Sequence, residues 1–540
     1  MAGKLISRTL LVLVCAQFII TIDTTFMNVS ISTLVRDLHT TVTGVQSAIT
    51  MYALVMAALM IAGAKFGDII GRKRAFILGL IVYAFGTTIT SLSRSLPVFM
   101  FGWSFLEGIG AAVMLPAMLS LIADNFAEGA ARAKAYATFA GTAGIAAALG
   151  PIIGGLFTTY LSWRLAFASE LLVALFVLLQ RKMLHEQKLP GAKPRFDWTG
   201  FMLAAVGLVV MVQGIILASA YGIVKARKDF VIAGHTLLQS GEVSPTVIFV
   251  IVGLGILAIF YAFESYRNRN TKSTLLNVKI LKIRSVSAGS TTLMMQSLLL
   301  TGVIFALSLY VQMELGYNAI ESGLTLLPLS VGVLIFSTVA GRVLGRRFSP
   351  KSIMLVGFCL ILLGVLAMGL TARDATTGLD FAIGLTFIGA GIGFVVSQDQ
   401  NLVISSVSAK YTNETGGVLN TFQNVGSSLG TSLAGAMILA VFVSVATGLV
   451  DSSSAFSPSE QTELNQAITA KAQIVSNEQL AAATNRLAPQ TQAEILQINT
   501  QARARALTTV YFGLGLIGLV GVGATLRLPK TAPLAQAGAT

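Results

Sequence analysis

The stretch Thr199–Ala218 has the sequence TGFMLAAVGLVVMVQGIILA, twenty residues without a formal charge. An α-helix rises 1.5 Å per residue, so about twenty apolar residues cross the roughly 30 Å hydrocarbon core of a bilayer. Val247–Phe263 and Val510–Leu526 are also uncharged and nearly as long. These three stretches predict helices that span a membrane.

The composition of the whole chain agrees with a membrane protein. Of the 540 residues, 54% are hydrophobic and 11% are charged, and the mean hydropathy is +0.79. Soluble domains contain about 25% charged residues, so this chain lacks the polar surface that a water-soluble globule needs. We therefore expect an all-α, polytopic membrane protein.

Fourteen apolar segments are present, and they divide into groups of six, two and six. Their ranges are 9–34, 45–66, 75–93, 97–122, 134–160, 164–181, 199–218, 245–264, 285–314, 322–343, 353–371, 380–404, 417–445 and 506–527. The first follows Lys4 and Arg8 like a signal peptide, but thirteen further spans favour an uncleaved helix.

This grouping predicts four parts of the chain. They are an N-terminal six-helix bundle (1–181), a central two-helix insertion with basic connectors (182–284), a C-terminal six-helix bundle (285–530) and a cytoplasmic tail (531–540). A long polar loop, 446–505, falls inside the second bundle. We expect it to be an external helical cap or a partly disordered arm.

The basic residues predict the orientation of the spans. When the N-terminus and every second loop are assigned to the cytoplasm, that side holds about 26 of the 37 lysines and arginines, as the positive-inside rule requires. Fourteen spans then place both termini in the cytoplasm. Loops that face anionic lipid headgroups account for the net charge of +14, so nucleic-acid binding is not expected.

Other classes of protein are excluded by what the sequence lacks. Cys15 and Cys359 both fall in apolar spans, and the three histidines have no metal-ligand spacing, so neither a disulfide framework nor a metal site is indicated. No GxxxxGK[ST] phosphate loop is present. We expect no cofactor and no enzymatic activity. Three energy sources for the protein remain: an ion gradient, the substrate's own gradient or a partner chain.

The two bundles repeat each other weakly. The loop Gly67–Arg74 (GDIIGRKR) after the second span corresponds to Gly341–Arg347 (GRVLGRR) in the second bundle. Both are short, basic and contain glycine. Two related six-helix bundles around a midplane cavity are typical of carriers that work by alternating access.

Several of these segments resemble motifs of the major facilitator superfamily, and within it of the fourteen-span drug:proton antiporters. The matching stretches are Ile22–Val29 (IDTTFMNV), Gly67–Arg74, Leu149–Gly155 (LGPIIGG), Ser162–Arg164 (SWR), Tyr310–Gln312 (YVQ) and Glu321–Pro328 (ESGLTLLP). The resemblance covers nearly the whole chain. It implies a monomeric exporter of drugs in the cytoplasmic (inner) membrane of a bacterium, surrounded by lipids and driven by protons as the coupling ion, with an accessory partner left open.

The resemblance also assigns gating roles to two glycine-bearing motifs. Gly67, Asp68, Gly71, Arg72 and Arg74 would form a cytoplasmic latch that opens and closes during transport; the alternative is a solvated basic loop. In the fifth span the pivot between helices would comprise Gly150, Pro151, Gly154 and Gly155. Small residues at four-residue spacing let helices approach closely, so tight packing alone is the alternative there.

Four acidic residues lie inside predicted spans: Asp23, Glu107, Glu170 and Asp399. A carboxylate in hydrocarbon is costly, so such residues usually face a cavity or a partner and mark ion pathways. We expect them to couple transport to protons. The alternative for each is a structural, hydrogen-bonded acid.

The chain departs from the family pattern at the place where coupling is expected. In the fourth span the family usually has Arg-x-x-Gln-Gly, whereas this chain has Ser104, Glu107 and Gly108. Glu170 stands where the family usually has an asparagine. In the loop motif, Ala64 replaces the usual leading glycine and Ile69 replaces one of the usual basic residues. Our hypothesis is that the proton relay has moved to Glu107 and Glu170.

Substrate selection is expected to depend on a hydrophobic cavity. Its candidate lining is aromatic and polar: Asn28, Trp103, Phe105, Phe139, Phe305, Tyr310 and Gln312. Aromatic faces and buried acids suit lipophilic cations, although each aromatic residue could instead face lipid or pack between helices. Two other functions stay open. One is an exporter or flippase of amphipathic lipids or metabolites, and the other is a non-transporting sensor or scaffold.

Overall fold

A computed structural model describes residues 2–126, 130–186, 195–232, 235–270, 273–408, 411–470, 477–485 and 487–529. Within these ranges, fourteen helices are long and apolar enough to cross a membrane, which confirms the predicted fold class. The predicted tail 531–540 lies outside the described residues, as does 187–194 of the first basic connector.

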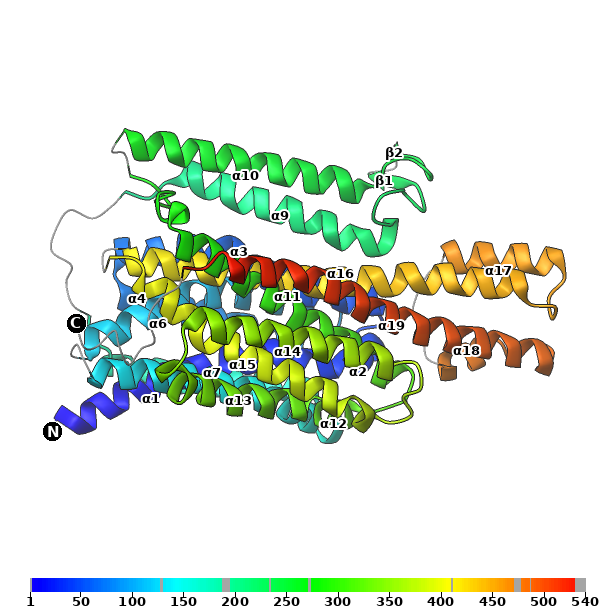
Figure 1. Cartoon of the computed structure of the whole chain (residues 1–540), viewed down its shortest axis with the longest axis horizontal. Helices are drawn as coiled ribbons and strands as arrows, with labels where there is room; N and C mark the ends of the chain where they lie inside the picture. Colours follow the sequence, from blue (N-terminus) through cyan, green and yellow to red (C-terminus); the bar gives the residue numbers. More distant parts are fainter. Residues whose placement is uncertain are drawn as a thin grey trace.

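The first six spans form one bundle (Figure 1). The first span consists of α1 (Ala2–Phe26), η1 (Met27–Ser30) and α2 (Ile31–Asp37), the second is α3 (Val42–Ile70), and the third is α4 (Arg72–Leu92). The fourth consists of α5 (Leu96–Phe99), η2 (Met100–Glu107) and α6 (Gly108–Asn125). The fifth is α7 (Ala130–Tyr160), and the sixth is α8 (Trp163–Leu179) with η3 (Gln180–Met183). Local sequence sets their limits. The hydroxyl of Thr41 caps α3 by accepting from Gly44 N at 3.1 Å, and Gly71 ends it with a φ of 106°, a conformation that favours glycine.

The central pair is α9 (Trp198–Tyr221) and α10 (Pro245–Arg269). A two-stranded antiparallel hairpin, β1 (Phe230–Ile232) and β2 (His235–Leu238), joins them, with Ile232 opposite His235. The pair lies along one side of the molecule (Figure 1). Leu208 and Val212 of α9 pack against Leu54 of α3 and Val425 of α16, so α9 rests on both bundles and α10 covers α9.

The second bundle consists of the helices from η4 to α16 together with α19. They are η4 (Ile280–Lys282), α11 (Arg284–Met313), α12 (Ala319–Thr325), α13 (Leu327–Arg342), η5 (Leu344–Arg346), α14 (Pro350–Thr371), η6 (Gly378–Phe381), α15 (Ala382–Ser405), α16 (Thr412–Ser452) and α19 (Pro489–Leu526). In the most apolar part of α11, 83% of the residues are buried inside the protein, against 17% for α10. The core of the second bundle is therefore built around α11.

Helices α16 and α19 extend well beyond a bilayer. They contain 41 and 38 residues, about 60 Å each at 1.5 Å per residue, and they project from the bundle with α17 (Pro458–Ala470) and α18 (Asn477–Ala483) (Figure 1). The predicted 446–505 loop is thus largely helical among its described residues. Its Ala- and Gln-rich sequence has high helix propensity, so α19 begins at Pro489 rather than near 506.

The two bundles meet along two lines of contact. On one, Ser428 and Thr421 of α16 donate to the carbonyls of Thr50 (3.1 Å) and Ala57 (3.3 Å) in α3. On the other, α7 packs against α12, where Ile320 N donates to Thr159 Oγ1 at 3.1 Å. Three of the four predicted acids lie in the first bundle, Asp23 on α1, Glu107 on η2 and Glu170 on α8.

Candidate functional site

The fourth span contains a π-helix, η2, from Met100 to Glu107. A π-helix inserts one extra residue in a turn and is frequent at functional sites. Trp103 and Glu107 on η2 are buried. Ser104, at the position of the family's arginine, donates its hydroxyl to Ala48 O at 2.8 Å. The fourth span therefore supplies an acid and an indole to the interior, and no cation.

Three of the four predicted acids come together. Asp23 of α1, Glu107 of η2 and Glu170 of α8 each place a carboxylate oxygen within 4.8 Å of the others. Their exposed fractions are 0%, 0% and 5%. We call these three residues the acid cluster.

Each member of the acid cluster accepts a hydrogen bond from a neutral donor. Trp103 Nε1 donates to Asp23 Oδ1 at 2.7 Å, Thr90 Oγ1 donates to Glu107 Oε1 at 2.9 Å, and Tyr83 OH donates to Glu170 Oε2 at 2.9 Å. The donors come from α4 and η2. Tyr52 of α3 stacks on Trp103, with ring centroids 5.0 Å apart and planes within 8°.

The acid cluster lacks a protein cation. In the described part of the chain, no lysine or arginine forms an ion pair with any of the three carboxyls, and Glu107 Oε2 has no hydrogen-bond partner there. Three negative charges at this spacing would repel strongly in a medium of low dielectric, and an unpaired buried charge is costly. The arrangement is therefore suited to holding protons, and its carboxylate oxygens could also surround a small cation.

Asp399 does not join the acid cluster. It lies on α15 in the second bundle, fully buried. Gly289 of α11 lies beside it, since a Cβ atom built there would be 3.1 Å from Asp399 Oδ1. Neither carboxylate oxygen has a hydrogen-bond partner among the described residues. The second bundle thus has a buried acid of its own.

The residues predicted to line a cavity have several different surroundings. Trp103 belongs to the acid cluster's hydrogen bonds, while Phe139 (7% exposed) and Phe305 (0%) are buried in the main core. The Tyr310 hydroxyl lies 3.4 Å from Ala375 O, the carbonyl to which it donates. Phe105 is 40% exposed and stacks on the exposed Phe101 at 6.0 Å. Phe105 is therefore exposed, while Trp103 and Glu107 on the same segment are buried.

Asn28 and Gln312 connect the two bundles. Gln312 of α11 donates through Nε2 to Asn28 O at 3.1 Å and accepts from Ser32 N at 2.9 Å. The structure thus places these two residues at a junction between α11 and the segment η1–α2.

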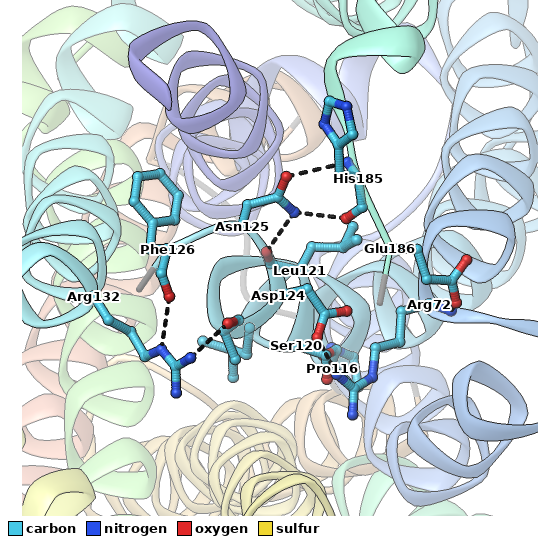
Figure 2. Close-up of polar contacts among 12 residues, drawn as sticks. Arg72, Pro116, Ser120, Leu121, Asp124, Asn125, Phe126, Arg132, His185 and Glu186 are labelled. Carbon is cyan, nitrogen blue, oxygen red and sulfur yellow. Dashed lines mark hydrogen bonds and ion pairs between the residues drawn. The ribbon is translucent and has the colours of Figure 1, made fainter. Parts of the chain in front are cut away.

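The loop motif after α3 is anchored inside the first bundle (Figure 2). Arg72 Nη1 lies 2.7 Å from Asp124 Oδ1 at the end of α6, and Arg72 N donates to Glu186 Oε1 at 2.6 Å. Gly71 leaves room for this carboxylate, because a Cβ atom there would be 2.7 Å from it. Of the other predicted latch residues, Gly67 is buried and Arg74 is exposed.

Neighbouring contacts extend this network. Asn125 Nδ2 donates to His185 O at 2.7 Å, and His185 N donates back to Asn125 Oδ1 at 3.1 Å. Arg132 Nε donates to Phe126 O at 3.0 Å (Figure 2). The loop motif, the end of α6 and the segment after η3 therefore form one connected surface.

The glycines of α7 allow close approaches on two sides. Cβ atoms at Gly150 and Gly154 would collide with Thr25 and Phe26 of α1, and one at Gly155 would be 2.6 Å from Ile320 Cα in α12. A Cβ atom at Gly323 would be 2.3 Å from Pro151 O. The motif thus sits where α7 touches both α1 and the second bundle.

Five residues of these sites were not predicted from the sequence. They are the neutral partners and counter-charges Tyr52, Tyr83, Thr90, Asp124 and Glu186. Tyr52, Tyr83 and Thr90 are polar residues inside apolar spans, which is a signal that sequence inspection can use. Asp124 and Glu186 lie at span ends, where acids are common and carry little information.

Comparison with known proteins decides the family. A sequence profile of the Major Facilitator Superfamily matches residues 13–431. The chain belongs to the major facilitator superfamily. Its members are membrane transporters rather than enzymes. The match begins in α1 and ends in α16, so it includes the acid cluster and Asp399.

Two similar proteins come from Streptomyces species. The chain is 27% identical over 449 residues to a protein described as a probable actinorhodin transporter of Streptomyces coelicolor, covering 82% of this chain and 74% of the relative. It is 28% identical over 429 residues to a puromycin resistance protein of Streptomyces alboniger, covering 78% and 80%.

Among solved structures, one similar fold is a bacterial homologue of the human lysosomal transporter Spinster in an inward-facing, unoccupied conformation. The TM-score is 0.60 at 14% identity, covering 98% of this chain and 99% of the other. This likeness supports the superfamily fold.

Proposed function

We propose that this transporter is a proton-coupled antiporter that exports lipophilic, cationic small molecules across the cytoplasmic membrane of a bacterium, with both termini in the cytoplasm. The observation that carries the proposal is the acid cluster, whose carboxyls are buried together and form no ion pair with a lysine or arginine among the described residues. Relatives described as an actinorhodin transporter and a puromycin resistance protein support export of small molecules.

The proposed coupling uses the acid cluster as the proton site. When the cluster is closed, as here, protons offset the charge of the carboxyls, and the indole, hydroxyl and phenol donors fix one oxygen of each. When alternating access opens a path to water, hydration stabilises the carboxylates and protons leave. A cationic substrate offers a second means of neutralising the same charge. Protons and substrate would then exclude each other, which is the requirement for antiport.

Asp399 is proposed as a second proton site in the other bundle. It is buried without a hydrogen-bond partner among the described residues, and it lies near the end of α15 that the basic loops assign to the cytoplasm. A proton there would be taken up or released on that side.

Purified protein in liposomes with an imposed pH gradient tests the proposal. We expect a lipophilic cation to dissipate the gradient in wild-type vesicles, and we expect no such effect with Glu107→Gln. Movement of labelled lipid without any dye-dependent proton movement would instead favour the lipid-exporter alternative. Absence of both activities would favour a sensor or scaffold.

A further inference from the structure

A small cavity lies in the first bundle between α1, α7 and α8. Its volume is about 100 Å³. Most of the lining is apolar and includes Phe18, Ile22, Ile153, Phe157 and Val173. Its polar side chains are Ser169 and Glu170, and Glu170 is its one ionisable group.

The helices that flank the cavity present apolar side chains outward. On α8, Leu172 directly precedes the lining residue Val173 and is 68% exposed. On α7, Leu156 directly precedes the lining residue Phe157 and is 42% exposed. In a membrane such surfaces contact lipid tails. The lining residues Ile153, Phe157 and Val173 are themselves partly exposed, so the cavity reaches this apolar outer face of the bundle.

The cavity contains one member of the acid cluster in its wall. Glu170 lines the cavity, is 5% exposed, and accepts from Tyr83 through Oε2. Behind it, oxygens of Asp23 and Glu107 lie within 4.8 Å. Glu170 is seven residues from Trp163, the first residue of α8, about 10 Å along the helix. A carboxyl at this depth can be reached from the membrane interior.

We propose that this cavity binds the head of a lipophilic amine that arrives from the hydrocarbon, with its ammonium group against Glu170 and its chain left in the membrane. Water occupies about 30 Å³ per molecule in the liquid, so the cavity has room for about three water-sized groups. That fits an ammonium head with its first carbons. A cation in hydrocarbon is stabilised by an opposing carboxylate, and apolar walls accommodate the chain.

This site deepens the proposed function, on which it rests, by naming the substrate class and its route. The amine and a proton would compete for one carboxyl, Glu170. The substrate would then be drawn from the bilayer, and the proton displaced from Glu170 would pass by way of Asp23 or Glu107 to water when the cluster opens.

Direct binding tests the site. Radiolabelled dodecylammonium is titrated onto purified protein in lipid nanodiscs, with protein-free discs as background and with dodecanol as the neutral competitor. Val173→Phe fills the cavity from α8, and Leu172→Phe places the same ring on the lipid-facing neighbour as a matched control. Ile153→Phe and the exposed Ile145→Phe form a second pair on α7, in case one filling variant fails to fold.

We expect Val173→Phe and Ile153→Phe to weaken dodecylammonium binding at least tenfold, and both controls to bind within twofold of wild type. Lowering the pH should release the amine, and dodecanol should not compete. Unchanged binding by both filling variants would overturn the inference, as would equal competition by dodecanol, which would mark the cavity as a site for lipid chains.

The same proteins in liposomes separate this inference from the proposed function. If the filling variants bind dodecylammonium like wild type while wild type still exchanges a dye for protons, the cavity is not the amine site and proton-coupled export stands. If the filling variants lose the amine but wild-type vesicles show no substrate-dependent proton movement, the site stands and antiport fails.

Discussion

The indole N–H of Trp103 donates to Oδ1 of Asp23 at 2.7 Å, across 80 positions of sequence. This bond joins the first and fourth spans at the centre of the acid cluster. Trp103 is also stacked on Tyr52, so three helices hold one carboxyl in place. The relationship places Asp23, the acid with the best family support, within reach of Glu107 and Glu170.

Replacing Trp103 by phenylalanine should separate the hydrogen bond from the stacking. The variant keeps a ring against Tyr52 and removes the donor to Asp23. A hydrogen bond to an ionised group contributes about 1.5–3 kcal/mol, so we expect substrate-driven proton movement to fall about 10- to 100-fold. The matched control is Trp198→Phe, because Trp198 is 65% exposed at the start of α9. Equal loss in both variants would contradict a specific role for the bond.

Glu107→Gln should change how transport depends on pH. The amide keeps the shape of the side chain and its contact with Thr90 but cannot exchange a proton. We expect wild-type export to vary with pH between about 5.5 and 8.5 and the variant to show at least a tenfold lower rate with a flat profile. Glu460→Gln, on the exposed helix α17, is the control. A flat profile in wild type as well as in the variant would count against coupling through Glu107.

Most of the fold could be predicted because lipid imposes a single strong constraint. Every backbone polar group in hydrocarbon must be satisfied, so each long apolar segment has to be a helix, and all fourteen are. The ends of α16 and α19 could not be predicted in the same way. Beyond the membrane their residues are polar, and the hydropathy signal stops before the helix does.

The acid cluster was predictable only as separate residues. Acids in apolar spans stand out, but the sequence does not show that Asp23, Glu107 and Glu170 face one another while Asp399 stands apart. Trp103 and Glu107 lie on the π-helix of the fourth span, where residues do not follow the ordinary α-helical spacing. Phe105 on the same segment is 40% exposed, and its place in a substrate cavity stays a prediction. Helical periodicity cannot reveal an inserted residue of this kind.

Breaking the Arg72–Asp124 ion pair should destabilise the first bundle. The side chains are 13% and 6% exposed and 2.7 Å apart, and removing one partner of a buried pair costs about 3–5 kcal/mol. We expect Asp124→Asn to lower the melting temperature in detergent by several degrees. The pair Arg36–Asp37 is the control: it is 3.9 Å apart, with Arg36 78% exposed, and such pairs contribute about 0–1 kcal/mol.

A charge exchange distinguishes the pair itself from the loss of either residue. The double variant Arg72→Asp with Asp124→Arg restores opposite charges at the same two helix ends. We expect it to recover part of the stability lost by Asp124→Asn. A double variant that is the sum of its two single variants would show that the residues do not interact.

Glu314, just beyond the end of α11, should make stability depend on pH. Burial raises the pKa of its carboxyl above the ordinary 4.5, and Arg503, 2.6 Å away, opposes the rise. The folded chain keeps this proton to a higher pH than the unfolded chain does. The contribution of Glu314 to the free energy of unfolding therefore decreases as the pH rises from 4.5 through the raised pKa, and it is constant above that pKa. The melting temperature of wild type should therefore fall relative to that of Glu314→Gln as the pH rises through this range. A wild-type advantage that grows with pH would refute the sign.

Gly155→Ala should disturb the junction of the bundles without altering the acid cluster. A Cβ atom at Gly155 would be 2.6 Å from Ile320 Cα and 2.7 Å from Ala319 O, and backbone atoms cannot move aside as a flexible side chain does. α7 and α12 must therefore separate. Gly141→Ala is a matched control on the same helix, because nothing lies within 4 Å of its added methyl group. We expect Gly155→Ala to increase labelling of a cysteine placed at Thr159, beside Ile320 N, several-fold, and to lower export, while Gly141→Ala changes neither. If Gly155→Ala leaves labelling unchanged but still abolishes export, the glycine acts through the motion of α7 against α1 and not through this junction.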